Sequence, residues 1–274
     1  MKKYIFMCIL IPLFISSISC SSVDVLRDKV SSSVNSELIA YYNFNEGAGD
    51  VLGDRSGYGN SGTIYGATWT EDRSGNGALY FDGVNDYVRI PADGIAAPLG
   101  ISSLDRGTIS VWFKFAEEAA PDGIFLPVFY MGPDTDAAAT GQGLVIEVGH
   151  KGIWNTSQEL FYTVTQYNNV NPTLCFDSGT DLTVNQWYHF AVTVSPDGNT
   201  GYLNGVEMTD REYNFGDNAF TNFFDSVTGG MLTIGTGRSA IDQAFYYFKG
   251  SIDDLRIYNR ALSAAEVLQL YQMP

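Results

Sequence analysis

Residues 250–263 read GSIDDLRIYNRALS, and this segment gives the strongest indication of the fold. The run 250–258 is typical of a buried strand, because apolar side chains alternate along it. The alternation predicts that Asp253 shares a face with Leu255 and Ile257, where an unpaired carboxylate would be costly. The sequence therefore predicts a partner that neutralises Asp253.

A glycine-rich and oxygen-rich segment near the start of the domain offers such a partner. Residues 54–63 read DRSGYGNSGT, in which glycines permit backbone carbonyls to turn inward and Asp54 and Asn60 supply side-chain oxygens. Calcium prefers oxygen ligands, so we expect a structural Ca²⁺ ion bound by Asp54, Asn60 and Asp253, with Asp254 as a weaker ligand. The alternative has no metal, and Asp253 accepts hydrogen bonds from the backbone of this loop.

The composition indicates an all-β domain. Aromatic residues make up 14% of the chain and Gly occurs 29 times, and the short apolar runs are separated by Asn, Asp and Gly, as in strands joined by turns. The expected strands are 38–44, 78–81, 87–90, 107–115, 125–131, 144–148, 159–166, 187–194, 200–203, 230–234 and 250–258.

Turn and cap residues support this assignment. The turn 196–198 joins one pair of strands, and Asn204 with Gly205 forms the tip of the next hairpin. Ser263 and Glu266 have the spacing of a capping box, which predicts a short C-terminal helix. We expect the apolar side of this helix to pack on the strands.

These segments, together with WYHFAVTV at 187–194 and GYLNG at 201–205, resemble the laminin-G-like jelly-roll domains of the concanavalin A-like lectin/glucanase superfamily. The resemblance covers residues 38–274. It implies a two-sheet antiparallel jelly-roll sandwich with a short C-terminal helix. Members of this superfamily bind sugars, bind proteins or accompany catalytic domains, so the resemblance does not choose among these functions.

The N-terminus predicts export. Residues 1–19 combine two lysines, a short apolar run and a serine-rich end, as in a signal peptide. Residues 18–20, Ile-Ser-Cys, resemble the end of a bacterial lipobox, although Ser17 departs from its usual leucine. We therefore expect lipidation at Cys20, a flexible tether over 20–37, and a lipid anchor at the outer membrane or cell surface. An ordinary signal peptide cut nearby is the alternative.

Cysteine and charge content restrict the possible partners. Lipidation would leave Cys175 alone, which we expect to be a buried structural thiol. The formal net charge of −16 argues against nucleic acid as a partner, because phosphate binding needs a basic surface.

Catalysis is disfavoured by the sequence. Retaining glycoside hydrolysis needs two carboxyl groups about 5 Å apart. Glu147 is the nearest candidate, but Val145 and Gly149 occupy the neighbouring positions on its face of the strand. No catalytic residue is therefore assigned.

Aromatic residues within polar segments indicate a binding function. Trp154, Tyr167, Tyr213 and Tyr246 lie beside Asn, Asp or Gln, and a sugar site needs a ring to stack on and polar groups to read hydroxyls. The opposing interpretation places these rings in the core. We expect a carbohydrate-binding, lectin-like envelope domain, and the alternative is a module that binds an envelope or host protein.

Overall fold

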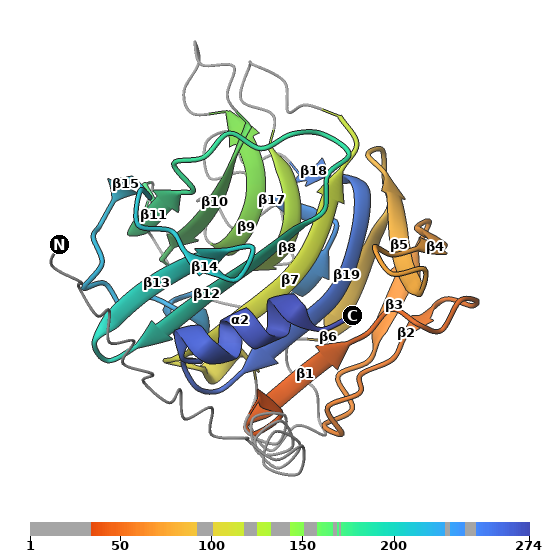
Figure 1. Cartoon of the computed structure of the whole chain (residues 1–274), viewed down its shortest axis with the longest axis horizontal. Coiled ribbons are helices and arrows are strands. Elements are labelled where there is room, and N and C mark those ends of the chain that lie inside the picture. Colours follow the sequence, from red (N-terminus) through yellow and green to blue (C-terminus); the bar gives the residue numbers. More distant parts are fainter. Residues whose placement is uncertain are drawn as a thin grey trace, which may run out of the picture.

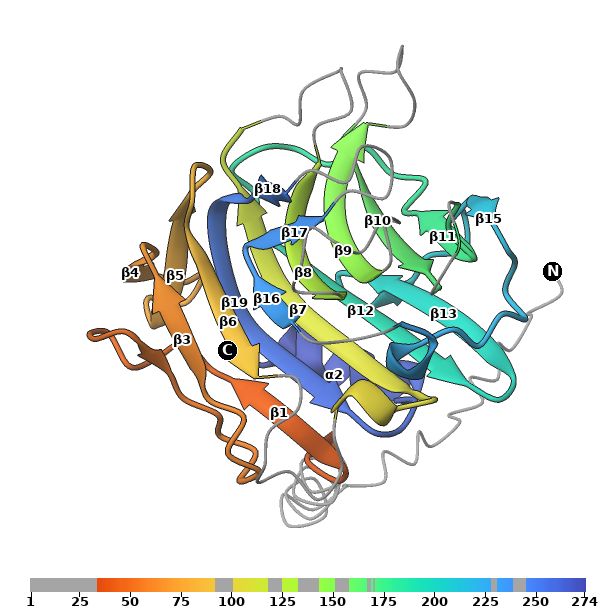
Figure 2. The ribbon, with the colours of Figure 1, turned by 180° about the vertical axis from the view of Figure 1, so that it is seen from behind.

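The protein forms two antiparallel sheets packed face to face, with the C-terminal helix on the outside (Figures 1 and 2). The computed structural model describes residues 34–91, 101–117, 125–132, 143–150, 158–166, 169, 171–227, 231–238 and 245–274. No helix in these ranges is long and apolar enough to cross a membrane. The expected all-β jelly-roll architecture is confirmed.

One sheet has eight strands. Its order is β14 (Val206–Glu207), β13 (Gly198–Leu203), β12 (Tyr188–Ser195), β7 (Gly107–Phe115), β19 (Lys249–Tyr258), β5 (Gly77–Asp82) and β4 (Thr68–Glu71), and β1 (Leu38–Tyr42) also pairs with β19. The first and last long strands of the domain are therefore neighbours, which closes the sandwich.

The other sheet has nine strands and faces the reader in Figure 2. Its order is β15 (Tyr213–Phe215), β11 (Leu174–Asp177), β10 (Gln158–Thr165), β9 (Gly143–His150), β8 (Leu126–Gly132), β16 (Met231–Ile234), β6 (Tyr87–Pro91), β3 (Gly62–Tyr65) and β2 (Val51–Leu52). A small hairpin is made by β17 (Thr236–Arg238) and β18 (Phe245–Tyr247). Short 3₁₀ turns lie at η1 (Ile101–Ser103) and η2 (Phe224–Ser226).

The long central strands agree with the sequence prediction, and the short strands were missed. β7 has the expected bounds, and its alternate residues Ile109, Val111 and Phe113 point into the core. The missed strands are β2, β3, β4, β11, β14, β15, β17 and β18, which are two to four residues long. Such short segments carry little periodicity, and their pairing depends on neighbouring strands.

A β-bulge in β19 corrects the predicted placement of Asp253. The register against β7 slips by one residue between Asp253 and Arg256, and Asp254 takes a φ of 50°. One extra residue in the strand turns Asp253 to the outer face, while Leu255 and Ile257 remain in the core. The expectation that these three side chains share a face was therefore wrong.

The C-terminal helix α2 (Ala264–Gln272) covers the outer face of the eight-stranded sheet, across β12, β7 and β19 (Figure 1). Ser263 and Glu266 form the predicted capping box. Val267 and Leu270 are fully buried in a second apolar cluster with residues of the sheet. The helix adds a third layer to the domain.

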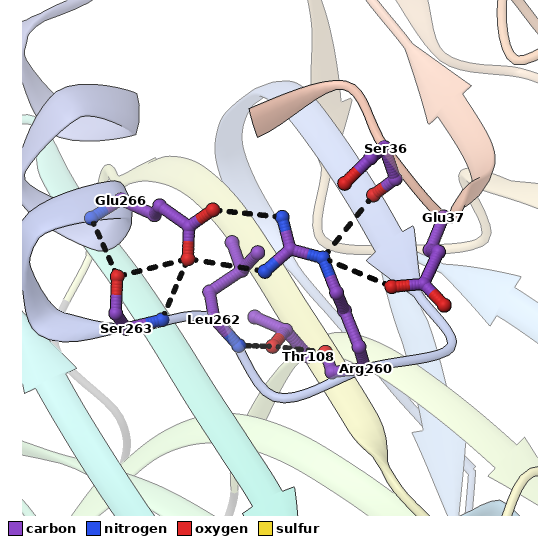
Figure 3. Close-up of polar contacts among 7 residues, drawn as sticks. All are labelled: Ser36, Glu37, Thr108, Arg260, Leu262, Ser263 and Glu266. Atoms are coloured by element: carbon purple, nitrogen blue, oxygen red, sulfur yellow. Dashed lines mark hydrogen bonds and ion pairs between the residues drawn. The ribbon is translucent and has the colours of Figure 1, made fainter. Parts of the chain in front are cut away.

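The first described residues, 34–37, contact this helix and the segment that precedes it. Val34 is fully buried within the same cluster. Arg260 binds Glu266 through both terminal nitrogens and also contacts Glu37 and the Ser36 carbonyl (Figure 3). The folded part therefore includes residues that the sequence assigned to a tether ending at residue 37.

Candidate functional site

Asp54 and Asn60, two of the predicted calcium ligands, are used to hold a loop. The Asp54 carboxylate accepts hydrogen bonds from the backbone N–H groups of Tyr41, Ser56 and Asn60 and from the Ser56 hydroxyl, at 2.8–3.0 Å. The Asn60 side chain donates to the Ile39 carbonyl. Both residues thus fasten the 54–60 loop to β1.

Asp253 and Asp254, the other two predicted ligands, each face an arginine. Arg73 donates to Asp253 at 2.9 Å, and Arg256 lies 3.0 Å from Asp254. Burial and the Asp254 charge raise the pKa of Asp253 to about 7, against the effect of Arg73. The partner predicted for Asp253 is therefore an arginine side chain. Among the described residues, the carboxylate that accepts from backbone N–H groups of the glycine-rich loop is Asp54.

These four residues do not fit a calcium ion in the arrangement shown. The Asp54 carboxylate accepts from the Asn60 backbone, and two arginines already supply positive charge beside Asp253 and Asp254. Within the described ranges, no three His, Cys, Asp or Glu side chains gather closely enough to hold a metal. These contacts do not test whether calcium binds, and chelation tests the sequence prediction.

Of the predicted sugar-contacting residues, Tyr213 and Tyr246 are described, whereas Trp154, Tyr167 and the lipidation residue Cys20 lie outside the described ranges. The Tyr213 hydroxyl donates to Asn199 and accepts from Arg211, both at 2.9 Å, and its ring packs edge-on against Phe176.

These contacts give Tyr213 a packing role. Tyr246 is half-buried on β18, opposite Gly237. The two tyrosines therefore belong to different elements, an edge strand and the small hairpin.

The outer face of the nine-stranded sheet, turned away from the other sheet, brings aromatic and polar side chains together. A single row of cross-strand partners runs over all nine strands: Val51, Thr63, Arg89, Thr233, Tyr130, Val145, Thr163, Cys175 and Phe215. The middle of the row is buried, and its two ends are exposed.

The β17–β18 hairpin covers the middle of this face. A side chain at Gly237 would meet the side chains of Pro127 and Tyr130 at about 3 Å, and Phe245 packs on Tyr130 and Val145. Figure 2 shows the hairpin beside β8 and β16. The face is therefore divided, with β2, β3 and β6 on one side of the hairpin and β9, β10 and β11 on the other.

The exposed side carries a pair of stacked tyrosines, which we call the tyrosine shelf. Tyr65 of β3 and Tyr87 of β6 lie opposite each other, with ring centroids 4.6 Å apart and planes inclined by 16°. Tyr65 is 44% exposed, although its ring is largely apolar. Thr63 and Arg89, which carry a hydroxyl and a guanidinium group, form the next cross-strand pair on the same face, two residues along each strand. An open aromatic surface with adjacent hydrogen-bonding groups suits a sugar ring.

Sequence reasoning missed Tyr65 because residues 54–63 were assigned to a calcium loop. The alternation of Thr63, Ile64 and Tyr65 was the available signal: Ile64 enters the core, and its neighbours point outward. Tyr87 was placed on a predicted strand, but its partner was not.

A buried serine–histidine pair was also missed, and its geometry is structural. Ser110 Oγ lies 2.8 Å from Nε2 of His189, beneath α2. Burial lowers the pKa of His189 to about 3, and its Nδ1 has no partner among the described residues. Without an orienting carboxylate or solvent access, this pair lacks the geometry of a nucleophilic site.

Two face-to-face antiparallel sheets with a capped C-terminal helix define a jelly-roll domain of the lectin-like class. The chain belongs to the concanavalin A-like lectin/glucanase superfamily, because the Laminin_G_3 family model matches residues 81–268. No curated protein sequence matches this chain.

Several solved structures share the fold. Domain 4 of the extracellular GH43 arabinanase AbnA from Geobacillus stearothermophilus, in complex with arabinotriose, is 23% identical with a TM-score of 0.56, over 86% of this chain and 98% of that one. The binding domain of botulinum neurotoxin DC in complex with SialylT is 14% identical with a TM-score of 0.58, over 87% and 52%. A sialidase from Trypanosoma rangeli is 15% identical with a TM-score of 0.58, over 86% and 32%. The chain thus spans about half or less of the last two proteins.

Proposed function

We propose that this domain binds carbohydrate through the tyrosine shelf on the outer face of the nine-stranded sheet. The observation that carries the proposal is the exposure of Tyr65 while it stacks on Tyr87 next to Thr63 and Arg89. A sugar presents an apolar ring face for stacking and hydroxyl groups for the hydrogen-bonding side chains. The shelf offers both.

Two further observations support this proposal and narrow the ligand class. Similar folds are found in complex with arabinotriose and with SialylT, so this architecture accommodates sugar ligands elsewhere. The net charge of −16 disfavours polyanionic glycans by long-range repulsion. We therefore propose an uncharged glycan.

A glycan array tests the function. The protein is applied in calcium and again in chelator, beside a Tyr65→Ala variant that removes the exposed ring. Saturable binding that the variant loses supports the shelf as the site. A blank array on folded protein contradicts carbohydrate binding altogether, and binding that survives the substitution contradicts the position of the site.

The second candidate function is binding of an envelope or host protein, and a different surface favours it. Residues 214–221 are all exposed and include Phe215 and Phe220, while Asn199 holds the loop through the carbonyls of Asp217 and Phe220. An ordered loop with two exposed rings is a suitable protein contact. Pull-down from envelope extracts with a Phe215→Ser/Phe220→Ser variant as control tests this function.

We also propose that the domain binds without catalysis and is exported with a lipid at Cys20. The serine–histidine pair described above lacks the parts of a catalytic site. Assays on arabinan and sialosides test whether the domain is catalytic. Release of product would contradict the proposal that it binds without catalysis. Mass spectrometry of the wild type and Cys20→Ser tests lipidation: an unmodified Cys20 would contradict the anchor.

A further inference from the structure

Glu147 is a buried carboxyl group without a hydrogen-bond or ion-pair partner in the described part of the chain. It lies on β9 and is 8% exposed. Other buried carboxylates have partners: Asp253 and Asp254 face arginines, Asp177 accepts from Asn214 and Gly179, Asp86 accepts from the Asp82 backbone, and Glu159 also makes an interaction. Glu147 is the exception.

The described residues directly beside Glu147, along and across the strands, are apolar. Its cross-strand neighbours on the outer face are Pro127 of β8 and Phe161 of β10. Along β9 it is flanked by Val145 and Gly149, and the Phe125 ring occupies the place where a side chain at Gly149 would project. Phe125 also packs edge-on against Phe161, with centroids 6.1 Å apart.

Burial raises the pKa of Glu147 to about 8, and no arginine or lysine among the described residues offsets this effect. On the outer face of the neighbouring described strands, the titratable groups are Glu159 on β10, Tyr130 on β8, and Cys175 and Asp177 on β11; Tyr246 lies on the β18 hairpin. The charge of Glu147 acts on Cys175, whose thiol is buried and contacts Thr163.

We propose that Glu147 is a pH-responsive element of the nine-stranded sheet, and that its ionisation loosens the packing of β8, β9 and β10 and exposes Cys175. A leucine or glutamine at this position would fill the space without a titratable group. The proposal is independent of carbohydrate binding, so a blank glycan array has no bearing on it.

The direction of the effect follows from linkage. A solvated glutamate ionises near pH 4.3, so between about pH 4.5 and 8 the open state is charged while the closed state still holds its proton. Each pH unit of increase in this range favours opening by about tenfold, and above about pH 8 the effect is constant. The sheet is therefore held closed in acid and loosens towards pH 8.

Labelling of Cys175 with N-ethylmaleimide tests the proposal on the full chain with Cys8→Ser and Cys20→Ser, so that Cys175 is the single thiol. Rates are measured by mass spectrometry at about pH 6 and 8 with and without Glu147→Gln, which keeps the shape but cannot ionise. The ratio of the two rates cancels the intrinsic pH dependence of the thiol. Glu159→Gln, on the same face, is the matched control.

We expect the labelling rate of the parent, divided by that of the Glu147→Gln variant, to rise at least tenfold between the two pH values. The Glu159→Gln variant should behave as its parent. A ratio that stays within twofold overturns the proposal. The melting temperatures of the parent and the Glu147→Gln variant could differ increasingly with pH while the ratio of their labelling rates stays constant. In that case Glu147 affects only global stability, and the proposed local opening is overturned.

Discussion

Arg73 and Asp253, which are 180 residues apart in the sequence, form an ion pair of 2.9 Å on the outer face of the eight-stranded sheet. Arg73 also lies 3.9 Å above the Trp112 ring and donates to the carbonyl of Met273, just after α2. One side chain from the turn between β4 and β5 therefore connects β7, β19 and the C-terminal helix. This connection neutralises the acid that the sequence placed in an apolar strand.

Removing Arg73 should destabilise the domain severely. Above about pH 7, where Asp253 is ionised, Arg73→Ala leaves the buried carboxylate without its partner, and breaking a buried ion pair costs about 3 kcal/mol or more. We expect this cost to appear as a lower free energy of unfolding in a urea denaturation curve. Asp253→Asn and the double variant complete a cycle, and additive effects would contradict a direct coupling between the two residues.

Asp253 should make stability depend on pH. Its pKa in the folded protein, about 7, lies above the ordinary value of about 3.9, so the folded state retains a proton that the unfolded state has lost. Between about pH 4 and 7 this group makes the free energy of unfolding fall as pH rises. Asp253→Asn should flatten the dependence in this range, and an unchanged slope would contradict the assignment.

Tyr65→Ala should weaken glycan binding about tenfold or more, because one stacked ring contributes about 1 kcal/mol beyond its buried area. Since Tyr65 is exposed, the free energy of unfolding should change by less than about 1 kcal/mol. Titration calorimetry with a glycan from the array measures the first effect. Tyr65→Phe should keep binding, and Val84→Ala is a control at an exposed apolar residue elsewhere.

Residues before β1 should be needed for full stability. Val34→Ala opens space between the sheet and α2, which costs about 2 kcal/mol, and a chain that starts at residue 38 also loses Glu37 beside Arg260. Thermal denaturation of chains starting at residues 30 and 38 checks this. Equal melting temperatures would show that the packing of Val34 contributes nothing.

Calcium removal should leave the melting temperature unchanged, because the carboxylates of Asp54, Asp253 and Asp254 already have protein partners. Differential scanning fluorimetry with and without chelator measures this. A lower melting temperature in chelator that Asp253→Ala abolishes would instead establish the predicted ion.

The sequence was sufficient for the elements whose signal is local. Alternation over 107–115 predicted β7, Asn204 and Gly205 predicted a hairpin tip, and Ser263 with Glu266 predicted the helix cap. Each depends on residues a few positions apart, whose spacing fixes the backbone conformation. The candidate site was harder to predict from the sequence, since Tyr213 is packed against other side chains and the strand that carries Tyr65 had not been predicted.

The sequence by itself determined an all-β sandwich with a capped C-terminal helix, because the periodicity of apolar residues decides which face is buried. Only the tertiary structure decided which distant residues meet: Arg73 with Asp253, and Tyr65 with Tyr87. It also left Glu147 without a polar partner among the described residues. The physical reason is strand register. A single extra residue at Asp254 reverses the face of Asp253, and cross-strand pairing places Tyr65 beside Tyr87.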